Sequence, residues 1–390
     1  MDFWESVLEI KNDLIKWRRA FHSHPELSFE EWKTSSFIKV LLKSEGIEYK
    51  EYANTGIVAT IYGNGTKTVA VRADMDALPI TELKFLEYSS KEKGKMHACG
   101  HDAHMAMVLG AIKIINKFKD RLKGNVKFIF EPGEEDTGGA SIMIYEGCLK
   151  NPDVLAIIGL HVREDIDSGK IGIKKGIVNV SSNPFKIIIE GKGGHGAFPE
   201  NTVDPIFVAC QMIMSIQGII TRELPATVPT VITIGEIKAG SSGNIIPKTC
   251  EINGIIRTLK DVHRQFIKKR IVEIGEGIAK SFRAEAAFNI IDGYPALLND
   301  NKIMDIVEGS AKKVVGEENI IYLENPLMSV ESFAYFAKEK PCAFYFLGIR
   351  NEEKGIIYPA HSPQFDIDED ALLYGTCMHC TALFDLLENL

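Results

Sequence analysis

Seven consecutive apolar or small residues, Val154–Leu160, lie between Pro152 and His161. A strand without alternation of polar and apolar residues is expected where both faces of a sheet are buried. Such sheets are mainly parallel, and helices cover them on both sides. This run therefore constrains the chain, more than any other feature, to an α/β fold with a buried central sheet.

Strand and helix patterns alternate on both sides of this run. The main patterns are strands Gly56–Tyr62, Thr68–Ala73 and Asn125–Phe130, helix Ala103–Phe118, helix Asn301–Val315, strand Ala343–Leu347 and helix Asp368–Leu387. Alternation of this kind predicts an α/β layer with a largely parallel sheet. We expect residues 1–179 and 293–390 to form this main domain.

The middle of the chain has a different order of elements. We expect strand Phe185–Glu190, helix Asp204–Arg222, strands Val228–Ile237 and Thr249–Leu259, helix Asp261–Phe282 and strand Glu285–Ile291. The order β-α-β-β-α-β is that of a split βαβ, or ferredoxin-like, α+β domain, with two helices on one face of a four-stranded antiparallel sheet. Residues 180–292 are therefore predicted to be a domain inserted into the first.

Charge and cysteine content narrow the class of protein. The net charge is −8, and basic residues do not interleave with aromatic ones, so we expect no nucleic-acid partner. The acidic start does not match a signal peptide, and no stretch is expected to reach the ~20 apolar residues of a membrane span. Seven cysteines, an odd number, favour free thiols in a reducing cytoplasm.

The segment Met96–His104 contains three histidines, one cysteine and one aspartate, at a turn before a helix. Thiolate, imidazole and carboxylate are ligands of zinc and related metals. The alternative is a buried cysteine with surface histidines, and the density of ligand types argues against it.

Two adjacent glutamates, Glu134 and Glu135, follow the strand that ends near Phe130. A metal hydrolase needs one carboxylate on the metal and another that takes a proton from water. Adjacent side chains point in different directions, so they are able to divide these tasks. Acidic pairs on solvated loops are nevertheless common, and this motif alone is weak.

Three further residues complete the predicted site. His161 ends the apolar strand, His361 lies between Pro359 and Pro363, and Asp76 follows another strand. Strand ends are where α/β proteins place functional groups. Asp76 would orient a ligand histidine. Taken singly, each histidine is more often structural, and Asp76 fits a solvated loop nearly as well.

The inserted segment offers polar candidates of another kind. His195 lies in the glycine-rich run Gly191–Ala197 and would polarise a carbonyl group. Arg257 would clamp a carboxylate with two bonds, and Asn244 is a second candidate for that group. Cys377 and Cys380 form a C-x-x-C motif, but inside a predicted helix, which argues against a redox function.

Taken together, the runs RADMDALP, MHACGHDAH, EPGEE, GLHV, GKGGHGAFPE, NIIP and HSPQFDIDED resemble one family. It is the amidohydrolase branch of the dinuclear metallopeptidases, which includes hippurate hydrolase, auxin-conjugate hydrolases, N-acetyldiaminopimelate deacetylase and aminoacylases. The resemblance covers essentially the whole chain and begins at RRAFHSHPELSFEE.

The resemblance implies a task for each candidate. Two divalent metal ions (zinc, manganese, nickel or cobalt) would be held by Cys99, His101, Glu135, His161 and His361. Glu134 would be the general base and then the acid, Asp76 would support a ligand, and His195 would stabilise the tetrahedral intermediate. Relatives are often homodimers that pair through the inserted domain, and in some of them this histidine serves the partner's site.

Two segments depart from the family pattern. Relatives usually have Gln-Pro-Ala-Glu-Glu where this chain has Glu131-Pro132-Gly133-Glu134-Glu135. They usually have Gly-Glu-Asp-Phe where this chain has Val330-Glu331-Ser332-Phe333. The second departure is expected to remove a carboxylate near the site, whereas the metal ligands are intact.

The sequence thus predicts hydrolysis of the amide bond of an N-acyl amino acid, a small-molecule substrate. The inserted domain would close over the metals, with Asn244 and Arg257 on the substrate carboxylate. A dipeptidase or carboxypeptidase with the same metals is the nearest alternative. A non-catalytic binding protein on this scaffold is a third hypothesis, which the intact ligand set disfavours.

Overall fold

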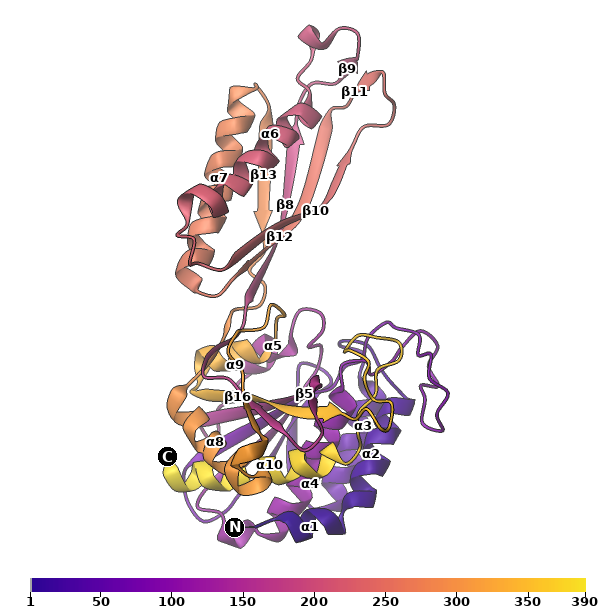
Figure 1. Cartoon of the computed structure of the whole chain (residues 1–390), viewed down its shortest axis with the longest axis vertical. Helices are drawn as coiled ribbons and strands as arrows, with labels where there is room; N and C mark the ends of the chain where they lie inside the picture. The colour runs from indigo at the N-terminus through magenta and orange to yellow at the C-terminus, as the bar shows by residue number, and fades with distance from the viewer. Residues whose placement is uncertain (1) are drawn as a thin grey trace. The chain divides into compact units, whose positions relative to one another are not determined.

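A computed structural model describes residues 2–390 and divides the chain into two compact units (Figure 1). The first unit contains Met1–Val178, Leu298–Pro326 and Glu331–Leu390, and the second contains Asn179–Leu297 and Leu327–Val330. The second unit contains more of the chain than the predicted residues 180–292. It extends to Leu297 and also includes the short segment Leu327–Val330.

An eight-stranded sheet forms the centre of the first unit, with the order β1-β2-β4-β3-β5-β16-β6-β15. Its strands are β1 Glu48–Tyr52, β2 Gly56–Ile61, β3 Thr68–Asp74, β4 Asn125–Glu131, β5 Ala156–Asp167, β6 Ile171–Ile173, β15 Ile320–Tyr322 and β16 Cys342–Arg350. The inner pairs β4–β3, β3–β5 and β5–β16 are parallel. The sheet is therefore mainly parallel at its buried centre, as predicted.

Helices cover both faces of this sheet. They are α1 Trp4–Glu9, α2 Lys11–Ser23, α3 Trp32–Ser44, α4 His101–Lys117, α5 Gly139–Tyr145, α8 Asn301–Val315, α9 Phe333–Glu339 and α10 Ala371–Asn389. Helices α4, α8 and α10 pack together on one face, whereas α5 and α9 pack on the other. Short strands β7 Gly176–Asn179 and β14 Leu297–Asn299 fall at the boundaries of the units.

The strand predicted at Val154–Leu160 begins later and continues much further, to Asp167. His161 therefore lies inside β5, paired with Phe346 of β16, and not at the strand's end. The prediction was wrong because it ended the strand at the first polar residue. Pairing with β16 continues past that point, so the backbone stays extended without an apolar sequence.

The second unit has a four-stranded antiparallel sheet of order β10-β12-β8-β13. Its elements are β8 Ser181–Glu190, β9 Gly194–His195, α6 Pro205–Gly218, β10 Thr230–Ala239, β11 Ile245–Ile246, β12 Thr249–Thr258, α7 Asp261–Ser281 and β13 Glu285–Ile290. Apolar residues of α6 and α7 pack on the sheet in a core of their own. The chain order is that of the split βαβ arrangement.

Helix α6 departs from the expectation that no apolar stretch approaches membrane length. With its π-helical continuation it spans Pro205–Glu223, with a mean hydropathy of 1.3, long and apolar enough to cross a membrane by length and composition. One side, including Met212 and Ile216, is buried against the sheet. Phe207 and Met214 on another side are exposed.

Candidate metal centre

The first unit gathers its candidate residues along three neighbouring parallel strands, after the carboxyl ends of two of these strands and within the third. Asp76 follows β3, Glu134 and Glu135 follow β4, and His161 lies in β5. Cys99 and His101 join them from the start of α4. Gly100 makes this turn with φ of 89°, and a side chain there would meet Val162 at 2.4 Å. The fold thus brings distant sequence motifs to one edge of the sheet.

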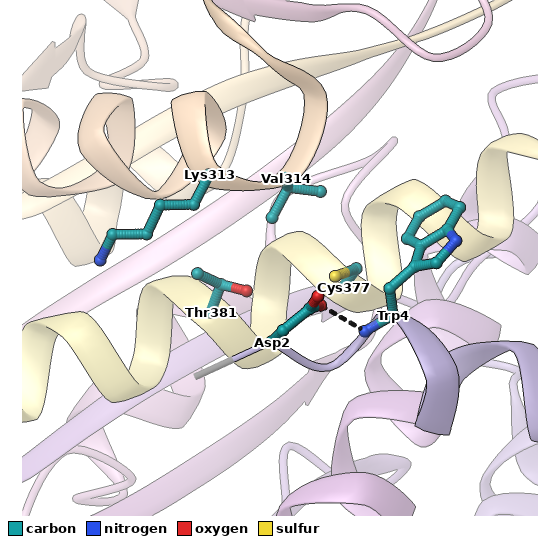
Figure 2. Close-up of a pocket in the computed structure, with 6 residues that line it drawn as sticks. All are labelled: Asp2, Trp4, Lys313, Val314, Cys377 and Thr381. Carbon is teal, nitrogen blue, oxygen red and sulfur yellow. Dashed lines mark hydrogen bonds between the residues drawn. The ribbon is translucent and has the colours of Figure 1, made fainter.

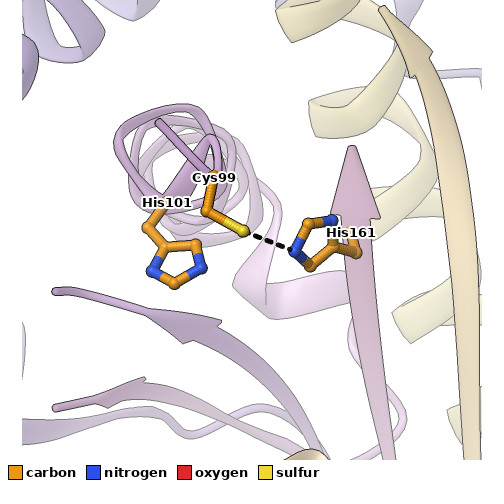
Figure 3. A group of neighbouring side chains, drawn as sticks. All are labelled: Cys99, His101 and His161. Carbon is orange, nitrogen blue, oxygen red and sulfur yellow. Dashed lines mark hydrogen bonds between the residues drawn. The ribbon is translucent and has the colours of Figure 1, made fainter. Parts of the chain in front are cut away.

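Cys99 and His101 enter the cluster from the start of α4, and His161 faces them from β5 (Figure 3). The thiol Sγ of Cys99 lies 3.4 Å from Nε2 of His161. His161 Nδ1 lies 2.7 Å from the carbonyl oxygen of Val162, and a carbonyl only accepts, so Nδ1 carries the proton. Nε2 of His161 therefore directs its lone pair towards Cys99.

His101 is oriented in the same way by Asp76. Its Nδ1 lies 2.9 Å from the backbone oxygen of Asp76 and 3.2 Å from Oδ1 of its carboxylate. Its buried Nε2 makes no hydrogen bond to any residue the structure describes. An imidazole held through Nδ1, with Nε2 left for another partner, is the usual state of a metal-ligating histidine.

Asp76 is itself held in place. Its Oδ2 accepts a hydrogen bond from Ser28 Oγ at 2.7 Å and another from the backbone N–H of Glu135 at 2.9 Å. Burial raises the pKa of Asp76. The hydrogen bond from His101 and the bond from the backbone N–H of Glu135 outweigh burial, so the pKa of Asp76 lies below its usual value. Asp76 thus connects His101 to the loop that carries Glu135.

Glu135 and His361 form the opposite side of the cluster. Glu135 Oε1 lies 3.4 Å from His361 Nε2 and 4.0 Å from His101 Nε2. His361 has φ of 64°, an uncommon backbone conformation, and its N–H donates to the oxygen of Ala98. The loop that presents His361 is therefore tied to the segment that presents Cys99.

Glu134 points elsewhere, although it is the neighbour of Glu135. Its Oε1 accepts a hydrogen bond from the backbone N–H of Ser332 at 3.0 Å, and the side chain is buried. Burial raises the pKa of Glu134 well above its usual value, and the nearby Glu331 and Glu135 raise it further. The adjacent carboxylates thus have separate environments.

His104 and Asp74, polar residues near the cluster, are already engaged with other groups. His104 donates from Nδ1 to Asp74 at 2.6 Å and accepts at Nε2 from the N–H of Val162, so both ring nitrogens have partners. Asp74 also receives a bond from Arg72 at 2.6 Å. His97 is different: it is buried, neither ring nitrogen makes a hydrogen bond to any residue that the structure describes, and burial lowers its pKa to about 4. The histidine-rich motif therefore contains both candidate ligands and structural residues.

The donor set fits a pair of divalent metal ions. Four groups of residues each bring three potential ligand atoms within 4.8 Å of one another: Cys99–His101–His161, Cys99–Glu135–His361, His101–Glu134–Glu135 and Asp74–His101–His104. His104 of the fourth group already has partners at both ring nitrogens. The bare Nε2 of His101, buried among carboxylates, is the observation that a bound cation explains best. Thiolate, imidazole and carboxylate suit zinc and its first-row neighbours.

Sequence reasoning missed several supporting residues. Arg72 is buried and bonded to Glu131 and Asp74, and Glu331 lies 3.1 Å from the same guanidinium. Arg72 is in the quoted run RADMDALP, and an arginine inside a buried strand was the available indication. Glu31, which accepts from the backbone N–H of Gly133 at 2.8 Å, had no such indication.

In the second unit, His195 and Asn244 lie close together, and Arg257 lies far from both along the sheet. Asn244 lies next to β11, which pairs with His195 of β9. Arg257 is near the other end of β12, beside Ser182, and donates to the oxygen of Met328 at 2.9 Å. Eight residues of extended strand, roughly 26 Å, separate Thr249 from Arg257. One copy of this unit therefore does not bring Asn244 and Arg257 to the same carboxylate.

His195 has a defined protonation pattern. Its Nδ1 accepts a hydrogen bond from the N–H of Ala197 at 3.1 Å. In the neutral ring the proton must then be on Nε2. The exposed Nε2–H is a donor, as stabilisation of an oxyanion requires.

Two other features of the first unit are separate from this centre. Cys377 and Cys380 are buried free thiols in α10, and burial raises the pKa of Cys377 to about 11, so a reactive thiolate is disfavoured. A cavity of about 490 Å³ beside Cys377 is lined by Asp2, Trp4, Lys313, Val314 and Thr381 (Figure 2). It contains none of the predicted site residues.

Residues 70–385 match peptidase family M20/M25/M40. The chain belongs to this family. It is 39% identical over 379 residues to thermostable carboxypeptidase 2 of Saccharolobus solfataricus, covering 96% of this chain and 95% of the relative. It is also 39% identical over 366 residues to N-acetyl-L-cysteine deacetylase of Bacillus subtilis, covering 93% and 86%.

A solved structure of this M20 family extends the comparison to the fold. A dinuclear metal-binding peptidase from Bacillus subtilis is 33% identical, with a TM-score of 0.85 over 98% of this chain and 99% of that one. The predicted family and α/β fold class are confirmed. A member with two metals and the ligand groups of this chain together support a site for two divalent ions.

Proposed function

We propose that the protein hydrolyses the amide bond of N-acyl amino acids in a dinuclear metal site. The observation that carries the proposal is the divergence of two adjacent carboxylates. Glu135 faces His101 and His361, whereas Glu134 is held by the N–H of Ser332. Metal hydrolysis needs these two separate tasks, one carboxylate as a ligand and one as a proton acceptor.

Five residues would hold the metals, and they are Cys99, His101, Glu135, His161 and His361. Bound divalent ions would lower the pKa of water and polarise the substrate carbonyl group. We propose that the ions are zinc, manganese, nickel or cobalt. The soft thiol of Cys99 favours zinc over magnesium or calcium.

The residues of the chain would carry the proton and orient the ligands. Glu134, raised in pKa, would accept a proton from the attacking water and then deliver it to the leaving nitrogen. Asp76 would keep His101 in the tautomer that points Nε2 inward. The Nε2–H of His195 would donate to the oxyanion of the tetrahedral intermediate.

We further propose that the second unit is a lid and the site of homodimerisation. The exposed Phe207 and Met214 of α6, and Ile237 on the edge strand β10, offer an apolar surface for a second copy. The separation within this unit suggests a division of work. Arg257 would serve its own chain, while His195 and Asn244, far along the sheet, would serve the partner's site.

The substrate class is inferred from the two relatives. Deacetylation of N-acetylcysteine and removal of a carboxy-terminal residue both release an amino acid with a free carboxylate. We infer that this carboxylate is the shared recognition element and that Arg257 binds it. The free thiols agree with a cytoplasmic location.

A substrate panel tests the proposal directly. N-acetyl, N-benzoyl and indole-acyl amino acids, together with dipeptides and longer peptides, are assayed with the same metal-loaded sample. We expect kcat/KM to be highest for an N-acyl amino acid. Faster cleavage of every peptide would instead support the alternative, a dipeptidase or carboxypeptidase, which the carboxypeptidase relative favours.

A further inference from the structure

Glu131 and Ser332 occupy the two segments in which this chain departs from the family pattern, and in the structure they contact each other. Ser332 Oγ donates to Glu131 Oε1 at 2.6 Å, across 201 residues of sequence. Both side chains are fully buried. The expectation that the second departure simply removes a carboxylate is therefore incomplete, because the carboxylate of Glu131 lies against the same position.

Arg72 closes a ring with these two residues. Its Nε donates to Glu131 Oε2 at 2.6 Å, and its Nη2 donates to Ser332 Oγ at 2.8 Å. Alternate side chains of a strand share a face, and Arg72 and Glu131 lie on the face covered by α5 and α9. Ser332 directly precedes α9. The ring is thus built from the ends of two strands and the start of a helix.

Ser332 also connects this ring to Glu134, the proposed base. The backbone N–H of the same Ser332 donates to Glu134 Oε1 at 3.0 Å. A displacement of Ser332 would therefore move the group that orients Glu134. Since reacting groups tolerate misplacement poorly, a shift of this kind lowers the rate without removing a ligand.

We propose that Glu131 and Ser332 act together to position Glu134. This arrangement requires a single carboxylate, which is located at either position 131 or position 332. This inference rests on the proposed function, in which Glu134 is the base. Arg72 already faces Asp74 at 2.6 Å and Glu331 at 3.1 Å. The remaining hydrogen-bond acceptors of Arg72 are Glu131 Oε2 and Ser332 Oγ.

The chemistry of each exchange follows from these contacts. In Ser332→Asp a second carboxylate faces Glu131 without the donor hydroxyl, so two buried negative charges repel each other. In the wild type, the N–H of Ala140 donates to Glu131 Oε1 at 2.8 Å and Arg72 Nε donates to Glu131 Oε2. In Glu131→Gln the amide NH₂ replaces one of these oxygens, so a donor then faces a donor. In the double variant the amide NH₂ finds an acceptor in the new carboxylate, which also accepts from Arg72; the contact of this NH₂ with the N–H of Ala140 remains, so rescue is expected to be large but incomplete.

The test is a double-mutant cycle on the metal-loaded, full-length protein, with wild type, E131Q, S332D and E131Q/S332D. We expect each single exchange to lower kcat about tenfold or more, with KM and metal content little changed. The double variant should return to within about fivefold of wild type. Effects that multiply in the double variant, or a loss of metal that parallels the loss of kcat, would overturn the proposal.

A second pair covers the case in which S332D does not fold. S332A removes the hydroxyl and keeps the N–H on Glu134. E131Q should then cost clearly less in the S332A background than in wild type, because the contact between the two side chains is already lost. An equal cost in both backgrounds contradicts joint positioning by the two side chains.

A matched control is available in the same unit. Ser310 Oγ also donates to a buried carboxylate, Asp385 Oδ2, at 2.6 Å, and Lys313 pairs with that carboxylate. S310A should lower the midpoint of thermal unfolding but leave kcat unchanged. If S310A lowers kcat as much as S332A does, the effect at Ser332 is general destabilisation, and the positioning proposal is wrong.

Failure of the proposed function is recognised separately. Wild-type protein that cleaves no N-acyl amino acid rejects the function, whatever the variants do. The midpoints of thermal unfolding still report the ring in that case. Two lowered midpoints and a restored one in the double variant support the requirement for a single carboxylate, and additive losses contradict it.

Discussion

The two units present their candidate residues in opposite ways. In the first unit, His101, Asp76 and Glu135 are mutually hydrogen-bonded or in close contact, and two of the three are completely buried. In the second unit, His195 and Asn244 are exposed and lie close together, whereas Arg257 is half-buried and separated from them along the sheet. The first set is thus preorganised to hold a ligand, whereas the second set, by our proposal, acts only when substrate or a partner chain approaches.

The largest effect should come from Glu134, the proposed base in the first unit. Glu134→Gln keeps the shape of the side chain but removes the proton acceptor, so kcat should fall on the order of 10²–10⁴-fold. Metal content, measured by elemental analysis, should stay at the wild-type value. Turnover close to wild type would show that Glu134 is not the base.

The next effect concerns the support of a ligand. Asp76→Asn weakens the acceptor for His101 Nδ1, and metal affinity should fall about 10–100-fold, measured by competition with a chelator. Ser28→Ala removes only one bond to the same carboxylate and should have a much smaller effect. Equal losses in both variants would mean that Asp76 acts through packing.

Arg257 of the second unit should affect substrate recognition and not metal binding. Arg257→Ala removes a charge-assisted bond of ~1.5–3 kcal/mol, so kcat/KM for N-acyl amino acids should fall about tenfold to somewhat over a hundredfold. Carboxamide analogues, which lack the carboxylate, should lose little. Equal losses on both substrates would indicate that the bond to Met328 makes Arg257 structural.

The smallest effect is expected at Asn244. A neutral hydrogen bond contributes about 1 kcal/mol, so Asn244→Ala should lower kcat/KM about fivefold. Mixing N244A with inactive E134Q separates the two geometries. If Asn244 serves the partner's site, the mixed dimers contain an intact composite site and regain activity, whereas independent sites would give only the activity of N244A.

The fold was predictable wherever the sequence shows a regular pattern of apolar and polar residues. The parallel centre and the split βαβ order followed from apolar runs and alternation, and helix α8 was predicted with the bounds observed. Strands such as β1, with the sequence EYKEY, were not predicted because an exposed edge strand carries no apolar pattern. The end of β5 was misplaced because pairing with β16, and not composition, extends it.

The site was predictable only as far as its motifs are local. Cys99 and His101 lie in one motif, predicted strand ends indicated Asp76, Glu134, Glu135 and His161, and flanking prolines indicated His361. The strand end predicted at His161 was wrong. The ring of Arg72, Glu131 and Ser332 was not predictable, because Glu131 and Ser332 are 201 residues apart and meet only in the folded chain. The separation of Asn244 from Arg257 likewise depends on the register of β12, which a single sequence does not specify.

The central claim is that paired metal ions in the first unit are required for amide hydrolysis. The most direct test measures metal stoichiometry and turnover of an N-acyl amino acid on one sample, through chelation and stepwise return of zinc or manganese. We predict that activity disappears with the metal and returns as about two ions bind per chain. Full turnover by protein that contains no transition metal would contradict the account.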